Sequence, residues 1–134
     1  MASRKLSDLD PRMVPLVENF VADCAKVGVD LLVTCTYRSN REQAEAYAKG
    51  RTMPGAIVTN AKPGQSKHNA VNTLLRPASQ AVDVVPMRAG KCVWDDRDPV
   101  WQTVGEIGER VGLEWAGRWT KMRELAHFQL LKQE

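Results

Sequence analysis

The stretch AVDVVP, residues 81–86, predicts a short buried strand with one carboxylate at its centre. Side chains alternate between the two faces of a strand, so Asp83 shares its face with Ala81 and Val85. These two neighbours are apolar, so this face is unlike a solvated one. A buried carboxylate is costly unless it is paired or binds a metal ion. A metal ligand or an ion-pair partner is therefore favoured over a solvent-exposed aspartate.

A helix is expected on the N-terminal side of this strand. Asp10 can cap it, Pro11 suits its first turn, and Gly28 would end it. Between these residues, apolar side chains recur at helical spacing from Val14 to Val27 and predict one buried face.

A second strand and a second helix are expected next. DLLVTCTYRS, residues 30–39, is apolar and β-branched, which indicates a buried strand. Ser39 and Glu42 have the spacing of a capping box and would start a helix with Ala44 and Tyr47 on its inner face.

A third helix and a last strand are expected after residue 86. Asp98 can cap the helix, Pro99 suits its first turn, and Gly112 would end it. EWAGRW, residues 114–119, predicts a turn, and LAHFQLL, residues 125–131, predicts the last strand.

Residues 51–80 show little periodicity and are rich in Gly, Pro, Asn and Ser. They predict a long functional loop with a short irregular helix near residues 72–75. The whole order predicts one α+β domain, residues 1–134, in which helices pack on a small and mostly antiparallel sheet.

Composition narrows the class of protein. The net charge of the 134 residues is +3, and the basic residues are scattered, so nucleic acid is not an expected partner. No apolar run is long enough to span a membrane, and MASRKLSDLDPR is not followed by the apolar segment of a signal peptide. The three cysteines lack CxxC spacing, which favours small buried thiols over a metal cluster.

The two histidines of the chain form the strongest functional pattern. His68 and His127, taken with Asp83, supply two imidazoles and one carboxylate, the ligand set of a catalytic zinc site that keeps a fourth position for water. A structural zinc site is more often closed by cysteines. Taken singly, each histidine would more often be a hydrogen-bonded structural residue.

Two further residues suit catalysis beside such a site. Glu124 enters just before the strand of His127 and can act as a general base if the chain turns between them. The alternative is a glutamate on a turn before an ordinary edge strand. Arg38 follows a buried strand and can stabilise an oxyanion, whereas the alternative is a surface ion pair with Glu42.

Five motifs in order resemble a known family. They are TYRSxxxQ (36–43), SxH (66–68), AVDV (81–84), GLxWxGxW (112–119) and ExxHF (124–128). Together they resemble the zinc D-Ala-D-Ala carboxypeptidase/L-alanyl-D-glutamate endopeptidase family of peptidoglycan peptidases, whose fold is shared with the hedgehog signalling domain. The resemblance extends over residues 8–130, nearly the whole chain.

The resemblance implies a role for each matching residue. It implies that His68, Asp83 and His127 bind Zn²⁺, that Glu124 is the catalytic base and that Arg38 stabilises the oxyanion.

It also implies substrate contacts. Ser66 would shape the metal loop, and Trp115 and Trp119 would line the substrate cleft, with core aromatics as the alternative for both tryptophans.

Two departures from the family pattern concern the shape of the cleft. Fourteen residues separate His68 from Asp83, where the family usually has six, and Ser79 stands where the family's glycine would align. Ala116 also replaces a frequent glycine. Loop insertions cost little free energy, so the site can survive the first change.

The resemblance also implies a biological setting. Its substrate lies outside the cytoplasmic membrane, yet an export signal is not expected. A phage endolysin resolves this, because it collects in the host cytoplasm and reaches the wall when a holin opens the membrane. We therefore expect a monomeric, antimicrobial hydrolase of host lysis, with peptidoglycan as its partner and no membrane insertion.

Three alternatives remain open at this point. A D-Ala-D-Ala carboxypeptidase would need a cation for the terminal carboxylate, such as Arg76, Arg118 or Lys121. A non-catalytic, zinc-stabilised wall-binding module would have no use for Glu124. A cytoplasmic α+β domain would hold no metal ion.

Overall fold

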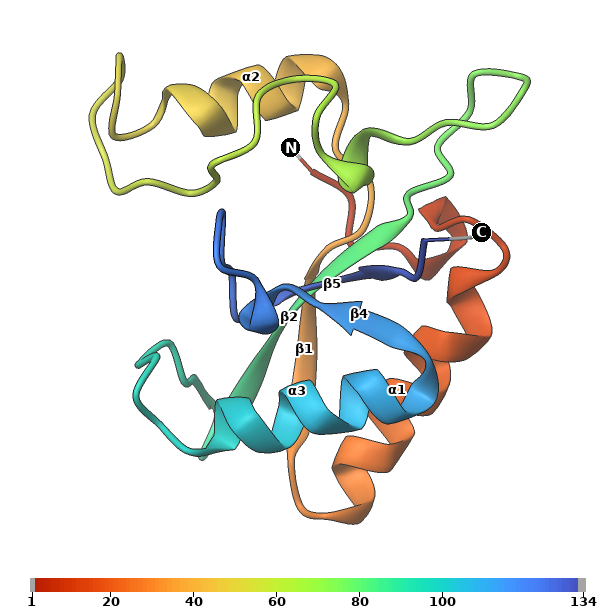
Figure 1. Ribbon diagram of the computed structural model, residues 1–134, viewed down its shortest axis with the longest axis vertical. Helices are drawn as coiled ribbons and strands as arrows, with labels where there is room; N and C mark the ends of the chain where they lie inside the picture. Colours follow the sequence, from red (N-terminus) through yellow and green to blue (C-terminus); the bar gives the residue numbers. More distant parts are fainter. Residues whose placement is uncertain (1, 133–134) are drawn as a thin grey trace.

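The computed structural model describes residues 2–132 and has an α+β architecture, as predicted (Figure 1). Its helices are α1 (Met13–Lys26), α2 (Asn40–Ala48) and α3 (Val100–Val111), with 3-10 segments at Leu6–Asp8, Lys67–Asn69 and Ala116–Arg118. Its strands are β1 (Asp30–Cys35), β2 (Ala81–Arg88), β3 (Lys91–Cys92), β4 (Leu113–Trp115) and β5 (His127–Leu130). Among residues 2–132, no helix combines the length and the apolar character needed to cross a membrane.

The sheet is antiparallel throughout and is centred on β2. The strand order is β1-β2-β5-β4, and the short β3 pairs with the end of β2. In this register Asp83 lies opposite Cys35 of β1 and opposite His127 of β5. Strand pairing alone therefore places two of the predicted metal ligands side by side.

One face of the sheet carries the hydrophobic core. Val82, Val84 and Phe128 are fully buried in a cluster with apolar residues of α1 and α3. The ring of Phe128 lies 4.7 Å from the ring of Phe20 in α1. Because side chains alternate along a strand, Asp83 and its partner in β5 project from the opposite face.

That opposite face is also dry along β2. Ala81 and Val85, which share it with Asp83, are both fully buried. The inference that this carboxylate does not sit on a solvated strand face is therefore confirmed.

The first helix begins later than its sequence indicates. α1 starts at Met13, and Asp10 instead accepts hydrogen bonds from the backbone N–H and the guanidinium of Arg12. At the other end Val27 is 59% exposed, so the inclusion of this residue in the apolar stripe was wrong. The helix ends at Lys26, so Val27 does not continue its buried face.

The second helix has the predicted capping box but a different inner face. The Ser39 hydroxyl accepts from the N–H of Glu42, whose carboxylate accepts from the N–H of Ser39. The fully buried position is Gln43, however, and Ala44 is exposed. α2 lies away from the core formed by α1 and α3 and covers the loop that follows it, so its inner face is polar (Figure 1).

Short strands and turns account for the other differences. EWAGRW is not one turn, because its first two residues belong to β4 and the 3-10 segment begins at Ala116. Strands β3 and β4 have two and three residues, too few to show an alternation in sequence. The short helix expected near residues 72–75 lies instead at Lys67–Asn69.

The long spacing between His68 and Asp83 is accommodated by a projecting arm, residues 69–80. Asn72 closes its tip, where the side-chain oxygen accepts from the N–H groups of Leu74 and Arg76. At its base the N–H of Gln80 donates to the carbonyl of Lys67 at 3.0 Å. The extra residues therefore extend outward while the ends of the arm stay together.

Two glycines allow α3 to approach the sheet closely. A Cβ atom at Gly105 would overlap the ring of Trp115, and one at Gly108 would overlap the ring of Phe128. We expect Gly105→Ala to destabilise the protein by about 2 kcal/mol, because overpacking outweighs the gain in helix propensity of about 1 kcal/mol. Urea denaturation measures this change.

The control is Thr103→Ala, at an exposed position of the same helix. We expect its free energy of unfolding to stay within about 0.5 kcal/mol of the wild-type value. If Gly105→Ala were as stable as this control, the close approach of α3 to Trp115 would be wrong.

Candidate active site

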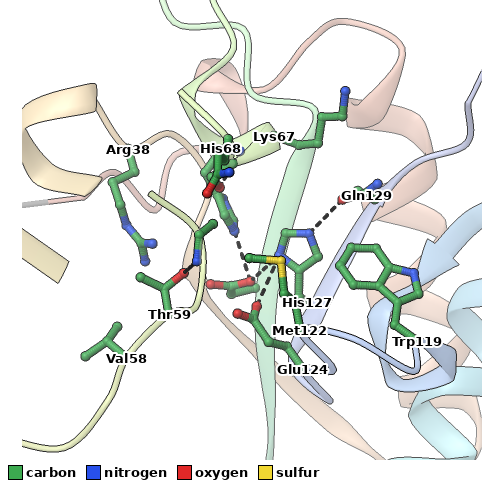
Figure 2. A pocket seen from close by; sticks show the side chains of 14 residues that line it. Arg38, Val58, Thr59, Lys67, His68, Trp119, Met122, Glu124, His127 and Gln129 are labelled. Atoms are coloured by element: carbon green, nitrogen blue, oxygen red, sulfur yellow. Dashed lines mark hydrogen bonds and ion pairs between the residues drawn. The ribbon is translucent and has the colours of Figure 1, made fainter. Parts of the chain in front are cut away.

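Two histidines from separate segments converge on one carboxylate oxygen. Asp83 Oδ1 lies 3.0 Å from His68 Nε2 and 3.3 Å from His127 Nδ1. The two imidazole rings meet edge to face, with centroids 5.1 Å apart. The structure therefore brings together the three residues that the sequence predicts as metal ligands, and Figure 2 shows His68 and His127 side by side with Glu124 next to them.

The outer nitrogen of each ring contacts a carbonyl oxygen. His68 Nδ1 lies 2.8 Å from the backbone oxygen of Thr36, and His127 Nε2 lies 2.9 Å from the amide oxygen of Gln129. Carbonyl oxygens only accept hydrogen bonds, so these ring nitrogens carry the proton. In the neutral rings, His68 Nε2 and His127 Nδ1 therefore present lone pairs to Asp83.

The three groups favour positive charge beside Asp83, either as a proton on an imidazole or as a metal ion that they hold together. Burial of His68 disfavours its charged form, but the Asp83 carboxylate outweighs this effect and raises the pKa of His68 to about 10. Burial likewise opposes ionisation of Asp83, yet His68 and His127 hold the pKa of Asp83 well below its usual range. The site thus attracts positive charge strongly, and a divalent metal ion satisfies all three groups at once.

Cys35 defines a second possible ligand set with His68 and Asp83, whose ligand atoms all lie within 4.8 Å of one another. Its Sγ atom lies 3.6 Å from His68 Nδ1, the nitrogen that contacts the Thr36 carbonyl. Cys35 therefore contacts the ring nitrogen of His68 that does not contact Asp83. The set with His127 fits better, although Cys35 is nearer to the site than its position in the sequence suggests.

Glu124 lies beside the same three residues. Its Oε2 atom is 3.8 Å from His127 Nδ1, and its backbone carbonyl accepts from the His127 N–H at 3.4 Å. Burial raises the pKa of Glu124; His127 opposes this and the negative charge of Asp83 adds to it. A carboxylate whose pKa is shifted toward neutrality suits proton transfer.

These groups form the floor of a cavity of about 350 Å³. Of the residues predicted for the site, Arg38, Ser66, His68, Asp83, Trp119, Glu124 and His127 line it. The Asp83 side chain is 21% exposed, so the metal-type ligands are reachable from the cavity.

Arg38 lies across the cavity from His127 (Figure 2). Only 9% of this residue is exposed, and its Nη1 donates to Gln43 Oε1 at 3.1 Å. Gln43 in turn donates to the Ala61 carbonyl and to the Thr59 hydroxyl. The buried glutamine of α2 therefore holds both the guanidinium and the adjacent loop in place.

The two predicted cleft tryptophans have different positions. The ring of Trp119 lies 5.7 Å from the ring of His127 and lines the cavity. Trp115 is 3% exposed and stacks on Phe128 in the core, so the prediction that it lines the cleft was wrong. Alternation along β4 turns Trp115 toward α3, where Gly105 leaves room for its ring, and Gly117 of the following 3-10 segment leaves room on another side.

Ser66 acts on the metal site through the backbone. Its hydroxyl accepts from the N–H of His68 at 3.1 Å and begins the 3-10 segment that carries this histidine. This geometry agrees with the expectation that Ser66 shapes the loop of the metal ligand.

Sequence reasoning missed several residues of the site. Gln129 shares the face of His127 because it follows two residues later in β5, a signal that the sequence did contain. Thr36 contributes a backbone carbonyl, and no pattern of side chains in the sequence predicts such a contact. Lys67, Thr59 and Met122 line the cavity from irregular segments.

Comparison with known proteins defines the class. Two sequence models described as D-alanyl-D-alanine carboxypeptidase match residues 6–75 and 59–130. The chain belongs to this family, which confirms the resemblance drawn from its motifs.

Named relatives add detail. The chain is 32% identical to the peptidoglycan L-alanyl-D-glutamate endopeptidase CwlK of Bacillus subtilis, over 93% of this chain and 75% of that protein. Its fold is similar to that of the L-Ala D-Glu endopeptidase ChiX of Serratia marcescens (TM-score 0.67, 22% identity, 98% of this chain and 89% of that one). It is also similar to the vancomycin-resistance D,D-pentapeptidase VanY in complex with Zn(II) (TM-score 0.63, 20% identity, 91% and 72%).

The two possible ligand sets predict different mutant behaviour. We expect His127→Ala to lower the affinity for Zn²⁺ by at least about 100-fold, whereas Cys35→Ala keeps it. Gln129→Leu removes the acceptor that orients His127 and should cost about 10- to 100-fold. Competition with a chromogenic chelator measures these affinities.

An equal loss in Cys35→Ala and His127→Ala would instead assign the thiol to the metal site. Circular dichroism of each metal-free variant serves as the control for folding.

Proposed function

We propose that this protein is a zinc-dependent peptidoglycan peptidase that cleaves the stem peptide, with the L-Ala–D-Glu bond as its favoured target. The observation that carries the proposal is the position of Glu124, 3.8 Å from His127 Nδ1, on the floor of a cavity that also exposes Asp83. A base beside a set of metal ligands in an accessible cleft is the requirement for metal-assisted amide hydrolysis. Similarity to the two endopeptidases supports the choice of substrate.

The residues present fit zinc. His68, His127 and Asp83 offer two nitrogens and one oxygen, and each ring has its outer nitrogen hydrogen-bonded, as metal-binding histidines require. Zinc bound there supplies Lewis-acid activation of water and of the scissile carbonyl.

The protein's own groups carry the proton and the developing charge. Glu124 takes a proton from the attacking water and delivers it to the nitrogen of the leaving amine as the C–N bond breaks. Its raised pKa makes both transfers accessible to one carboxylate. Arg38, held by Gln43, stabilises the negative charge that forms on the carbonyl oxygen.

The positions of cationic side chains help to distinguish an endopeptidase from a carboxypeptidase. A D-Ala-D-Ala carboxypeptidase would have to hold a terminal carboxylate. Arg76 lies near the tip of the projecting arm, Arg118 pairs with Glu109, and Lys121 is exposed. None of these three expected cations lines the cavity above Glu124. Lys67 does line it, and a carboxypeptidase would use this residue. A non-catalytic wall-binding module would not need a carboxylate at the position of Glu124.

The biological setting that we propose is that of a phage endolysin. The protein would collect in the host cytoplasm and act on the wall after a holin opens the membrane. Expression in a susceptible host tests this: lysis should require co-expression of a holin, and lysis without one would contradict the proposal.

Glu124→Gln tests the chemistry directly. We expect kcat on purified peptidoglycan to fall by about 10²- to 10⁴-fold while bound zinc stays near the wild-type amount, because the amide keeps the shape but cannot accept the proton. Release of new amino termini and elemental analysis provide the two readouts. Glu18→Gln, at an exposed position of α1, is the matched control.

Mass spectrometry of the products identifies the bond. New amino-terminal D-Glu supports the endopeptidase, and free D-Ala identifies the carboxypeptidase. If wild-type protein holds zinc but releases neither product from several wall types, the proposed activity is wrong.

Arg38 provides a second test. We expect Arg38→Ala to lower kcat by about 10²-fold with a smaller change in KM, because the guanidinium acts on charge that forms in the transition state. Gln43→Leu should lower kcat by about tenfold, since Arg38 then loses the partner that positions it. A rise in KM alone would assign Arg38 to ground-state substrate binding instead.

A further inference from the structure

The cleft does not end at the reaction centre. A second cavity of about 480 Å³ shares Asp83, Glu124 and Arg38 with the first cavity. The two therefore meet at the catalytic carboxylates, and a polymer bound across Glu124 would occupy both. We refer to the second one as the indole cavity, defined by its outer wall of Trp94, Asp96, Trp101 and Arg123.

Two indole side chains distinguish this wall. Trp94 is 59% exposed, so a face of its ring is available for contact. Trp101 is 3% exposed, and its Nε1 is buried without a hydrogen-bond partner within residues 2–132. That nitrogen is fully buried, so Trp101 forms part of the packed wall, and Trp94 is the indole that a ligand can contact.

In the part of the indole cavity that is not shared with the reaction centre, the wall carries one negative and one positive charge. Asp96 supplies one negative charge and Arg123 one positive charge, with the Arg123 Nε donating to the Gly117 carbonyl. Such a wall favours a neutral polar ligand over an ammonium or a free carboxylate. An exposed indole offers a rigid apolar surface, and the charged groups offer partners to hydroxyl and amide groups. A pyranose ring with an N-acetyl group has this combination of an apolar face and a polar edge.

We propose that the indole cavity binds the N-acetylated sugar that carries the stem peptide, an inference that rests on the proposed endopeptidase function. Asp83 and Glu124 line both cavities, so a group in the indole cavity lies close to the bond being cut. In peptidoglycan the sugar is attached to the amino end of L-Ala, one residue from the L-Ala–D-Glu bond. The D-Ala–D-Ala bond lies several residues further from the sugar and could not use this cavity in the same way.

Binding to a zinc-loaded Glu124→Gln protein tests the subsite without turnover. The two ligands are N-acetylmuramyl-L-Ala-D-Glu and the sugar-free N-acetyl-L-Ala-D-Glu, titrated by calorimetry. We expect the sugar-bearing ligand to bind about tenfold more tightly, the effect of one good aromatic contact. Adding Trp94→Ala should bring its affinity down to that of the sugar-free ligand, and Trp94→Phe should restore part of the difference.

Leu74→Ala is the control, because Leu74 is 71% exposed on the projecting arm and lines neither cavity. Equal affinity for the two ligands would overturn the subsite, and so would a loss in Trp94→Ala that is the same for both. Cleavage of peptidoglycan by the wild type without a sugar preference leaves the proposed function standing and rejects the subsite. A Trp94-dependent sugar preference in a protein that cleaves nothing supports the subsite and rejects the proposed function.

Discussion

The pairing of β2 with β5 is the constraint on which the rest of the structure depends. It sets Asp83 directly opposite His127, while the adjacent residues Val82 and Phe128 turn to the other face and enter the core. A slip of β5 by one residue would move His127 into the core and Phe128 into the cleft. Packing of the hydrophobic residues against α1 and α3 therefore also enforces the register of the metal site.

The site gathers several groups that can bind one cation. Two imidazoles and one carboxylate converge at the floor of the cavity, and Glu124 adds a second carboxylate nearby. The rings are held in this arrangement by carbonyl partners behind them, the backbone of Thr36 and the side chain of Gln129. Binding of a divalent ion would thus stabilise the folded protein as well as prepare it for chemistry.

Irregular segments build the walls of the cleft around this rigid floor. Gln43 of α2 fixes both Arg38 and the loop near Ala61, and the segment before α3 supplies Trp94 of the indole cavity. The projecting arm between residues 69 and 80 extends away from the floor, and its ends are hydrogen-bonded to each other. In this design the strands position the reacting groups, and the loops can vary to select the substrate.

The sequence by itself determined the fold class, the three helices, the buried strand with Asp83 and the set of metal-type ligands. Periodicity and capping residues depend on neighbours in the chain, and the small number of histidines is visible in the composition, so each can be read from the sequence. Only the tertiary structure decided which face each element buries and which residues meet across the cleft. Trp115 lies in the core, Gln43 is the buried residue of α2, and Cys35 contacts His68. These outcomes depend on strand register, close helix packing and backbone carbonyls, which arise from contacts between residues far apart in the chain.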